Sequence, residues 1–441
     1  MNLKTRARST FMRHAVTLAY LEKQRSKGRK RRQREGHPPT VHYFHQANDP
    51  YSHLAVQKLD QLKQRYNLSF QPHLTSEPNA AYQGSADHFA QWALADALGV
   101  AADYDTHFAP AMDTPSQANV ALANRRLAAH LDQDDFASIA IETGTALWHG
   151  TTIDPTTSPD TAQRAIQAGN ARRAELGHYQ GAMFYFDGEW FWGIDRIRLL
   201  EQRLSAEGFD SSAGAPCVPQ PFPQPFPQPF PQPGRHSVEG KSSTGILLEY
   251  FPSLRSPYTA IGHQRVLDLI AATGVDVKVR PVMPMLMRGI PAPREKQRYI
   301  ITDAAREGRQ FDAPFGRIVD PFGEPVKRAF ALFPQADALG KGLDFVTAYL
   351  NAAWFDGVDI TTVAGLKTVT TNAGLSWQAI TQNRDGNDWQ AQLTDNLATL
   401  TAQNLWGVPS FRVSGGTKTE AYACWGQDRI WRVASEIARR I

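Results

Sequence analysis

Proline occupies every second position from Pro219 to Pro233, in the run VPQPFPQPFPQPFPQPG. A helix or an inner strand cannot form here, because proline fixes φ and has no backbone N–H to donate. The tract must therefore be extended, at about 3.1 Å per residue. We expect residues 205–245 to be a semi-rigid linker between two folded parts, with a docking site for an aromatic groove as the alternative.

The two parts that this linker separates can be laid over each other. VHYFHQANDPYSHLA begins at position 41, and LEYFPSLRSPYTAIG begins at position 248. Each predicts a short strand, a Pro-Tyr turn and an amphipathic helix, followed by another strand at 68–70 or 275–279. Four residues recur at a fixed offset of 207: Tyr43, Phe44, Pro50 and Tyr51. The pattern therefore predicts a βαβ unit twice.

The ends of the two parts also correspond. GAMFYFDGEWFWGIDRIRLLEQRL begins at Gly181, and GVPSFRVSGGTKTEAYACWGQDRIWRVASEI begins at Gly407. Each predicts a β-hairpin followed by a helix that starts at Gly-x-Asp-Arg. Helical stretches lie between the βαβ unit and the hairpin. This order predicts an α/β chain with two thioredoxin-like domains, each carrying an inserted helical subdomain.

Cysteine content limits the chemistry. The chain of 441 residues has only Cys217 and Cys424, which form no C-x-x-C pair. This excludes a zinc ribbon, an iron–sulfur motif, a dithiol redox centre and a disulfide framework. Charged residues interrupt the apolar positions near the N-terminus, so no secretory or membrane-spanning segment is expected. We therefore expect a soluble, cytoplasmic protein.

Positive charge is concentrated at the N-terminus. Residues 1–36 contain 12 of the Lys and Arg side chains and 2 of the Asp and Glu side chains, a local net charge of +10, although the whole chain carries only +4. We expect residues 1–40 to be a basic, disordered and solvated tail, with a nucleic-acid or anionic-lipid contact as the less favoured alternative. The rest of the chain is slightly acidic, so no other nucleic-acid contact is expected.

Residues 246–441 resemble the 2-hydroxychromene-2-carboxylate isomerase and kappa-class glutathione transferase family, within the DsbA-like thioredoxin superfamily. The motifs occur in the family's order: EYFPSLRSPYTAIG, VRPVMPMLMRG, EKQRYIITDAAREGRQF, WFDGVDI, GVPSF and CWGQDRIWRV. Residues 41–204 resemble the same fold more weakly, through DPYSHLA and WGIDRI. We interpret this first part as a diverged duplicate.

The resemblance implies glutathione as the cofactor and Ser256 as the catalytic residue. Ser256 stands where disulfide oxidoreductases of the superfamily carry their first cysteine. A hydroxyl at the first turn of a helix can donate a hydrogen bond to the glutathione thiolate, and the helix N-terminus favours the same anion. Alternatively, Ser256 is a plain helix N-cap.

The resemblance also implies a glutathione-binding set. The bond between Val408 and Pro409 is expected to be cis, with the Val408 backbone pairing with the extended tripeptide. Gln427, Asp428 and Arg429 are expected at the γ-glutamyl end, and Lys296 near the glycyl end. A structural role for Asp428 and Arg429 is an equal alternative, because Asp195-Arg196 occurs in the first part.

The first part departs from this pattern at two positions. Asp49 stands where Ser256 stands, and Met183 replaces Pro409. A carboxylate would repel a thiolate, and a cis bond before methionine costs about 2.5–4 kcal/mol. We therefore expect no catalytic glutathione site in this part. His45 and His53 lie near Asp49 in the sequence. We expect these three to be polar surface residues, with a metal or acid–base site as the less favoured alternative because no third ligand is evident.

The leading hypothesis is a glutathione-dependent isomerase of the 2-hydroxychromene-2-carboxylate type, whose thiolate adds reversibly to an aromatic or conjugated acid. The alternatives are a kappa-like transferase or peroxidase, a disulfide oxidoreductase by superfamily only, and a non-catalytic binding protein. The expected partner is a small electrophile. No membrane partner is expected, and the first part is a candidate for an intramolecular pseudo-dimer partner.

Overall fold

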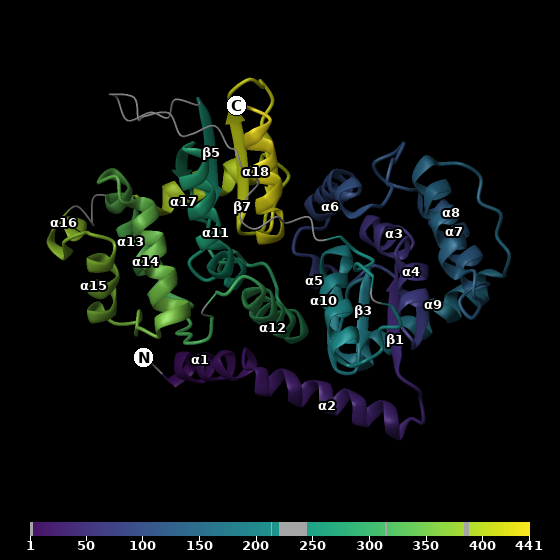
Figure 1. Cartoon of the computed structure of the whole chain (residues 1–441). Helices are drawn as coiled ribbons and strands as arrows, with labels where there is room; N and C mark the ends of the chain where they lie inside the picture. The colour runs from purple at the N-terminus through teal and green to yellow at the C-terminus, as the bar shows by residue number, and fades with distance from the viewer. Residues whose placement is uncertain (1–2, 213, 220–244, 314, 383–387) are drawn as a thin grey trace. The chain divides into compact units, whose positions relative to one another are not determined.

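The computed structural model describes residues 3–212, 214–219, 245–313, 315–382 and 388–441. Its chain divides into two compact units (Figure 1). The N-terminal unit comprises residues 21–221 and 292–296, and the C-terminal unit comprises the described residues of 1–20, 222–291 and 297–441. Most of the proline tract lies outside the described residues, so the linker stays a prediction.

The N-terminal unit contains a four-stranded sheet of order β2-β1-β3-β4. Strands β1 and β2 are parallel, and β1 with β3 and β3 with β4 are antiparallel. Its elements are α2 (Leu18–Arg34), β1 (Thr40–His45), α3 (Pro50–Val56), α4 (Leu59–Arg65), β2 (Ser69–Leu74), α5 (Ala80–Gln83), α6 (Ala86–Val100), η1 (Ala102–Tyr104), α7 (Gln117–Ala128), α8 (Phe136–His149), α9 (Pro159–Leu176), β3 (Met183–Phe186), β4 (Glu189–Trp192) and α10 (Gly193–Ala206).

The C-terminal unit contains a second four-stranded sheet, of order β6-β5-β7-β8. Its pairings follow the same scheme, parallel for β5 with β6 and antiparallel for the others. Its elements are α1 (Leu3–Ala15), β5 (Ile246–Phe251), α11 (Pro257–Thr273), β6 (Asp276–Val279), η2 (Met285–Arg288), α12 (Arg294–Gln310), α13 (Glu324–Ala338), α14 (Gly342–Leu350), the π-helical turn η3 (Asn351–Asp356), α15 (Val363–Asn372), α16 (Trp377–Thr381), α17 (Trp389–Thr401), β7 (Ser410–Gly415), β8 (Tyr422–Trp425), η5 (Gln427–Arg429) and α18 (Ile430–Ala438).

The expected fold class is therefore confirmed: each unit has a βαβ start, a helical insert, a β-hairpin and a final helix. Aromatic residues of the central strands pack in equivalent places, since Tyr43 stacks on Phe184 and Tyr250 stacks on Phe411. The helix expected after Pro50 is interrupted, because the chain turns at residues 57–58 between α3 and α4. There the side chain of Gln57 donates to His107 O and accepts from His107 N.

The inserted helices of the C-terminal unit form its larger core. Apolar residues of α13, α14, α15 and η3 are buried together with Leu254, which lies in the loop between β5 and α11. Trp354 of η3 is fully buried, and its indole N–H donates to Leu254 O at 3.3 Å. The insert therefore holds the loop that leads to Ser256 in place. Among the helices described, none is long and apolar enough to cross a membrane.

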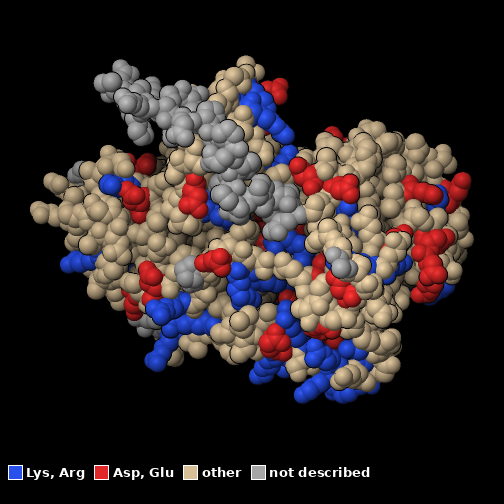
Figure 2. Space-filling model, viewed as in Figure 1, with Lys and Arg blue, Asp and Glu red and all other residues tan. Residues whose placement is uncertain are grey.

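The expectation of a disordered basic tail is wrong for residues 3–34, which form α1 and α2. Helix α1 packs on the C-terminal unit through a stripe that includes the buried Thr5 and Ser9, and Val16 follows it into the core. Arg8 Nε lies 2.6 Å from the buried Asp320 carboxylate, and Arg13 Nε donates to Ile318 O at 2.7 Å. Other Lys and Arg side chains lie on the surface, where Figure 2 draws them in blue. Sequence reasoning missed this docking because the acceptors lie some 300 residues away.

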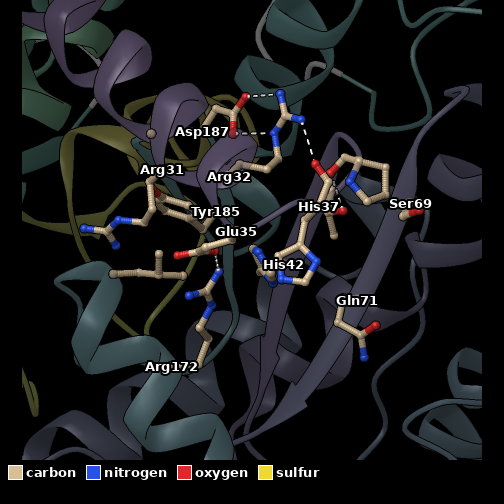
Figure 3. A pocket seen from close by; sticks show the side chains of 14 residues that line it. Arg31, Arg32, Glu35, His37, His42, Ser69, Gln71, Arg172, Tyr185 and Asp187 are labelled. Carbon is tan, nitrogen blue, oxygen red and sulfur yellow. Dashed lines mark hydrogen bonds and ion pairs between the residues drawn. The ribbon is translucent and has the colours of Figure 1, made fainter.

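Helix α2 lies against the sheet of the N-terminal unit and helps to enclose a pocket of about 270 Å³ (Figure 3). Basic groups line it, but they face carboxylates. Arg32 makes hydrogen bonds of 2.9 and 3.0 Å to Asp187, and Arg172 lies 3.1 Å from Glu35. Because these arginine charges are neutralised by carboxylates, the pocket does not indicate an anion-binding site.

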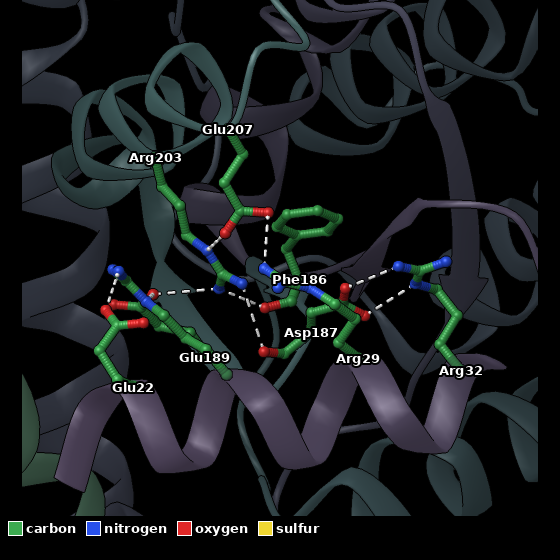
Figure 4. Close-up of polar contacts among 9 residues, drawn as sticks. Glu22, Arg29, Arg32, Phe186, Asp187, Glu189, Arg203 and Glu207 are labelled. Carbon is green, nitrogen blue, oxygen red and sulfur yellow. Dashed lines mark hydrogen bonds and ion pairs between the residues drawn. The ribbon is translucent and has the colours of Figure 1, made fainter. Parts of the chain in front are cut away.

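The docked face of α2 is a stripe of arginines one or two turns apart (Figure 4). Arg25 lies 3.0 Å from Glu189, and Arg29 lies 3.3 Å from Glu207. Gly28 lies between them, and a Cβ at this position would fall 2.1 Å from the backbone nitrogen of Gly188. The hairpin turn between β3 and β4 thus approaches the helix so closely that only glycine fits.

This contact predicts an inversion of the usual helix propensity. In an isolated helix, Gly28→Ala would stabilise the helix by about 1 kcal/mol, because alanine has the higher helix propensity. Here we expect destabilisation of about 2 kcal/mol or more, because the added methyl group displaces the hairpin backbone. Urea unfolding measures the change, and the exposed Ser26→Ala in the same helix is the control. A Gly28→Ala protein as stable as the wild type would contradict the contact.

Candidate functional site

Ser256 lies at the start of helix α11, between the two parallel strands of the C-terminal sheet in the chain. Strand β5 ends at Phe251, a short loop follows, and Ser256 is the N-cap of α11. Its Oγ accepts a hydrogen bond from Thr259 N at 3.1 Å, and Pro257 stands at the first helical position. Proline is favoured there because that position needs no N–H donor. The N-cap alternative for Ser256 is thus realised in the free protein.

The electrostatic setting of Ser256 favours an anion. The first turn of α11 contains no acidic residue, so nothing on the helix offsets its positive end. Arg255 precedes Ser256 and is held by Asp320, with its Nε 2.7 Å from Oδ1. The same carboxylate binds Arg8, so this cluster carries two guanidinium groups for one carboxylate. Sequence reasoning did not single out Arg255, although it stands within the RSPY motif.

The loop before β7 lies against Ser256. The Val408–Pro409 bond is cis, as expected. Ser256 Oγ donates to Val408 O at 3.4 Å, so residues 152 positions apart meet here. In the described part of the chain, no group accepts a hydrogen bond from Val408 N–H. An extended peptide can therefore pair with this backbone without displacing an existing hydrogen bond.

Packing holds this loop closely. A Cβ at Gly407 would lie 2.0 Å from the indole of Trp425, so glycine is required for the approach of strand β8. Arg288 Nη2 donates to Trp406 O at 2.8 Å. Gly426 N donates to Pro409 O at 2.8 Å, which ties the loop to the end of the hairpin. The Val408 backbone is thus presented by a rigid frame.

Gln427, Asp428 and Arg429 form η5, directly before α18. Gln427 is fully buried, accepts from Arg265, and donates from Nε2 to Glu307 Oε2 at 3.1 Å. Arg429 is also buried. Asp428 is only half-buried, so it is the member of the trio that remains partly open to solvent. The geometry therefore favours Asp428 over its neighbours as a direct ligand contact.

Lys296 has a partner in the N-terminal unit. Its Nζ donates to Tyr82 O at 2.6 Å, and residues 292–296 group with that unit. Burial lowers the pKa of Lys296 to about 8. Its expected role near the glycyl end of glutathione stays a prediction.

The corresponding place in the N-terminal unit is closed by its own side chains. Asp49 caps α3 and accepts from Tyr51 N, from Ser52 N and, at 2.8 Å, from Ser52 Oγ. Ser52 Oγ in turn accepts from Ala182 N at 3.0 Å. Ala182 precedes Met183, as Val408 precedes Pro409. The backbone donor that is open at Val408 is therefore occupied at Ala182.

The expectation that His45, His53 and Asp49 are surface residues is wrong, because all three are buried. Burial is the largest cause that lowers the pKa of His45 to about 3 and that of His53 to about 4, so both are neutral near pH 7. Across the described ranges, no group of three or more His, Cys, Asp or Glu side chains is arranged to hold a metal ion.

Asp49 makes a testable contribution to the pH dependence of stability. Burial raises its pKa from 3.8 to about 6, although its hydrogen bonds oppose the shift. A carboxyl group with a raised pKa stabilises the fold below about pH 4, and this stabilisation is lost as the pH rises through about 6. Asp49→Asn should therefore gain stability relative to the wild type between these values, by up to about 3 kcal/mol.

Urea unfolding at several pH values measures this difference. Buried histidines act with the opposite sign, but they are common to both proteins and cancel in the comparison. The matched control is Asp154→Asn, which changes an exposed carboxylate. A difference between Asp49→Asn and the wild type that does not change with pH would contradict the burial of an ionisable Asp49.

Residues 247–438 match the model of the family described as DSBA-like thioredoxin domain. A putative protein disulfide isomerase from Nitrosomonas europaea is 15% identical, with a TM-score of 0.36, over 43% of this chain and 96% of its own. A 2-hydroxychromene-2-carboxylate isomerase is 18% identical, with a TM-score of 0.36, over 44% and 95%.

The cytosolic disulfide reductase DsbM from Pseudomonas aeruginosa is 18% identical, with a TM-score of 0.32, over 44% of this chain and 98% of its own, and it has also been solved with GSH. A search of curated proteins finds no match. The family match confirms the expected superfamily, and the C-terminal unit contains a DsbA-like thioredoxin domain.

Proposed function

We propose that the C-terminal unit binds glutathione and holds its sulfur as a thiolate beside Ser256. The observation that carries this proposal is the 3.4 Å contact between Ser256 Oγ and Val408 O. It brings the Ser256 hydroxyl, at the start of α11, against Val408, the residue whose backbone N–H has no acceptor in the described part of the chain. A bound tripeptide would pair its backbone with Val408. The Ser256 O–H would then turn from Val408 O to the sulfur, which also lies at the positive end of the helix.

The residues at this place oppose disulfide exchange. Serine replaces the sulfur that such exchange needs. Cys424 is buried in β8, and burial raises the pKa of the Cys217 thiol to about 12, so neither cysteine supplies a reactive thiolate here. The protein must therefore obtain its reactive sulfur from a ligand. Glutathione fits this requirement, because Asp428 can bind its ammonium group while the basic surroundings of Ser256 favour its acidic groups.

The proposed reaction is a reversible addition. The thiolate attacks a conjugated carbon of an aromatic or unsaturated acid, a C–S bond forms, and the electron pair of the double bond moves to the conjugated carbonyl oxygen. Rotation follows about the bond that is now single. The electron pair then returns, the C–S bond breaks, and glutathione leaves unchanged. A kappa-like transferase is the alternative, and it would release the conjugate instead.

We infer that the N-terminal unit is a duplicate without this activity. Two observations support this inference. The strand order of the two sheets matches, and Asp49 and Ser52 close the corresponding site in the N-terminal unit. Ser52 and Thr259 occupy equivalent positions, and both accept a hydrogen bond from the backbone of the preceding loop. The capping geometry is thus common to both units, although the open donor is found only at Val408.

Replacement of Ser256 tests the proposed function. We expect wild-type protein to bind one glutathione per chain in calorimetry and to lower the pKa of its thiol. Ser256→Ala should raise the pKa of bound glutathione by about one unit, because the thiolate loses a hydrogen bond worth roughly 1.4 kcal/mol. The thiolate absorbance in the ultraviolet, followed against pH, measures this shift.

The matched control is Ser376→Ala, which removes the N-cap of α16, where Ser376 Oγ accepts from Ala379 N at 3.0 Å. Loss of either cap costs about 1 kcal/mol of stability, but only Ser256→Ala should change the thiol pKa. Absence of glutathione binding by the wild type would overturn the proposal. Binding of two molecules per chain would overturn the assignment of the N-terminal unit. Product analysis with a hydroxychromene carboxylate separates isomerase from transferase.

A further inference from the structure

The outer face of α2 carries a line of cations that the docking of this helix leaves exposed. Its inner face uses Arg25, Arg29 and Arg32 to bind carboxylates of the N-terminal unit. On the opposite side, four basic residues recur at helical spacing, and all four are exposed: Lys23, Lys27, Lys30 and Arg34. We call this set the outer stripe. Residues three, four and seven apart share one face of a helix, so these side chains form one row.

The outer stripe carries positive charge that the described protein does not neutralise. None of its four members forms an ion pair with a described carboxylate. The two acidic residues nearest to it are already paired, Glu22 with Arg25 and Glu35 with Arg172. Lys27, Lys30 and Arg34 also line a shallow, open depression of the surface. The stripe therefore presents four cations on a helix that is held in place.

We propose that the outer stripe binds the phosphate backbone of a nucleic-acid duplex without reading its sequence. The row extends from Lys23 to Arg34, about 16 Å along the helix, so its charges are spaced along a line as phosphates are. The chain beyond residue 36 has a net negative charge, which repels a polyanion and leaves the basic helix as the contact. This surface is independent of the proposed glutathione site.

The chemistry of the stripe favours a duplex over two other anionic partners. A helix that lies in a membrane interface needs an apolar face, but the stripe contains no apolar side chain and the other face of α2 is docked. Proteins that hold single strands stack the unpaired bases on aromatic rings, and no aromatic residue belongs to the stripe. Contacts to phosphates alone suit a duplex, whose backbone is regular and whose bases are paired.

Fluorescence anisotropy with a labelled DNA duplex of about 20 base pairs tests the proposal on the full chain. Four phosphate contacts predict a slope of about −3.5 for log K against log salt, a loss of roughly 100-fold in affinity between about 50 and 200 mM salt. The variant K23Q/K27Q/K30Q/R34Q should bind at least about 10-fold more weakly at about 100 mM salt and show a slope near zero.

The control variant K278Q/K341Q/K367Q/R439Q removes the same charge from exposed positions of the C-terminal unit. It should keep most of the affinity and the slope, and circular dichroism checks that both variants remain folded. Equal losses in the two variants would overturn the proposal, because net charge alone would then explain binding. No binding by the wild type at low salt would also overturn it.

Three further ligands separate the possible polyanions. A duplex RNA of equal length should bind with a similar salt slope, because the stripe contacts phosphates. A single strand should bind more weakly. Vesicles of phosphatidylcholine and phosphatidylserine should fail to compete with the duplex, and preferential binding of either the vesicles or the single strand would contradict the assignment.

Discussion

The antiparallel pairing of β5 with β7 is the constraint on which the candidate site depends. Its register places Phe251 opposite Ser410, so the loop after β5 meets the loop before β7. This pairing brings Ser256 and Val408 together although they are 152 positions apart, and the packing of the two loops holds them in contact. The hydroxyl at the helix start and the open backbone donor thus become one site through the sheet.

The same pairing exists in the N-terminal unit, between β1 and β3, with a different outcome. Asp49 replaces Ser256, and a serine one turn into the helix closes the backbone donor of Ala182. A thiolate would meet a carboxylate group there, and a tripeptide would have to break an existing hydrogen bond. The same fold therefore has an open site in the C-terminal unit and a closed site in the N-terminal unit, because a few side chains at this position differ.

Helices α1 and α2 show how a basic segment is ordered by acceptors far away in the chain. Arg8 reaches Asp320, and Arg32 reaches Asp187, and both of these carboxylates are buried. A charge run without apolar periodicity predicts a solvated tail, and nothing within residues 1–36 indicates otherwise. The docked arginines also divide α2 into two faces, which separates paired charges from the exposed outer stripe.

The sequence alone determined the fold class and the repeat of the βαβ start, because strand and helix periodicity and Pro-Tyr turns are local signals. The candidate site residues came from the resemblance of residues 246–441 to a known family. The same resemblance implied the cis bond before Pro409, which the structure contains. Only the tertiary structure decided that Gln427 is buried, that Lys296 contacts Tyr82 and that Ala182 is capped by Ser52. These facts depend on contacts between residues distant in the chain, and such contacts arise only when the sheets and inserted helices pack together.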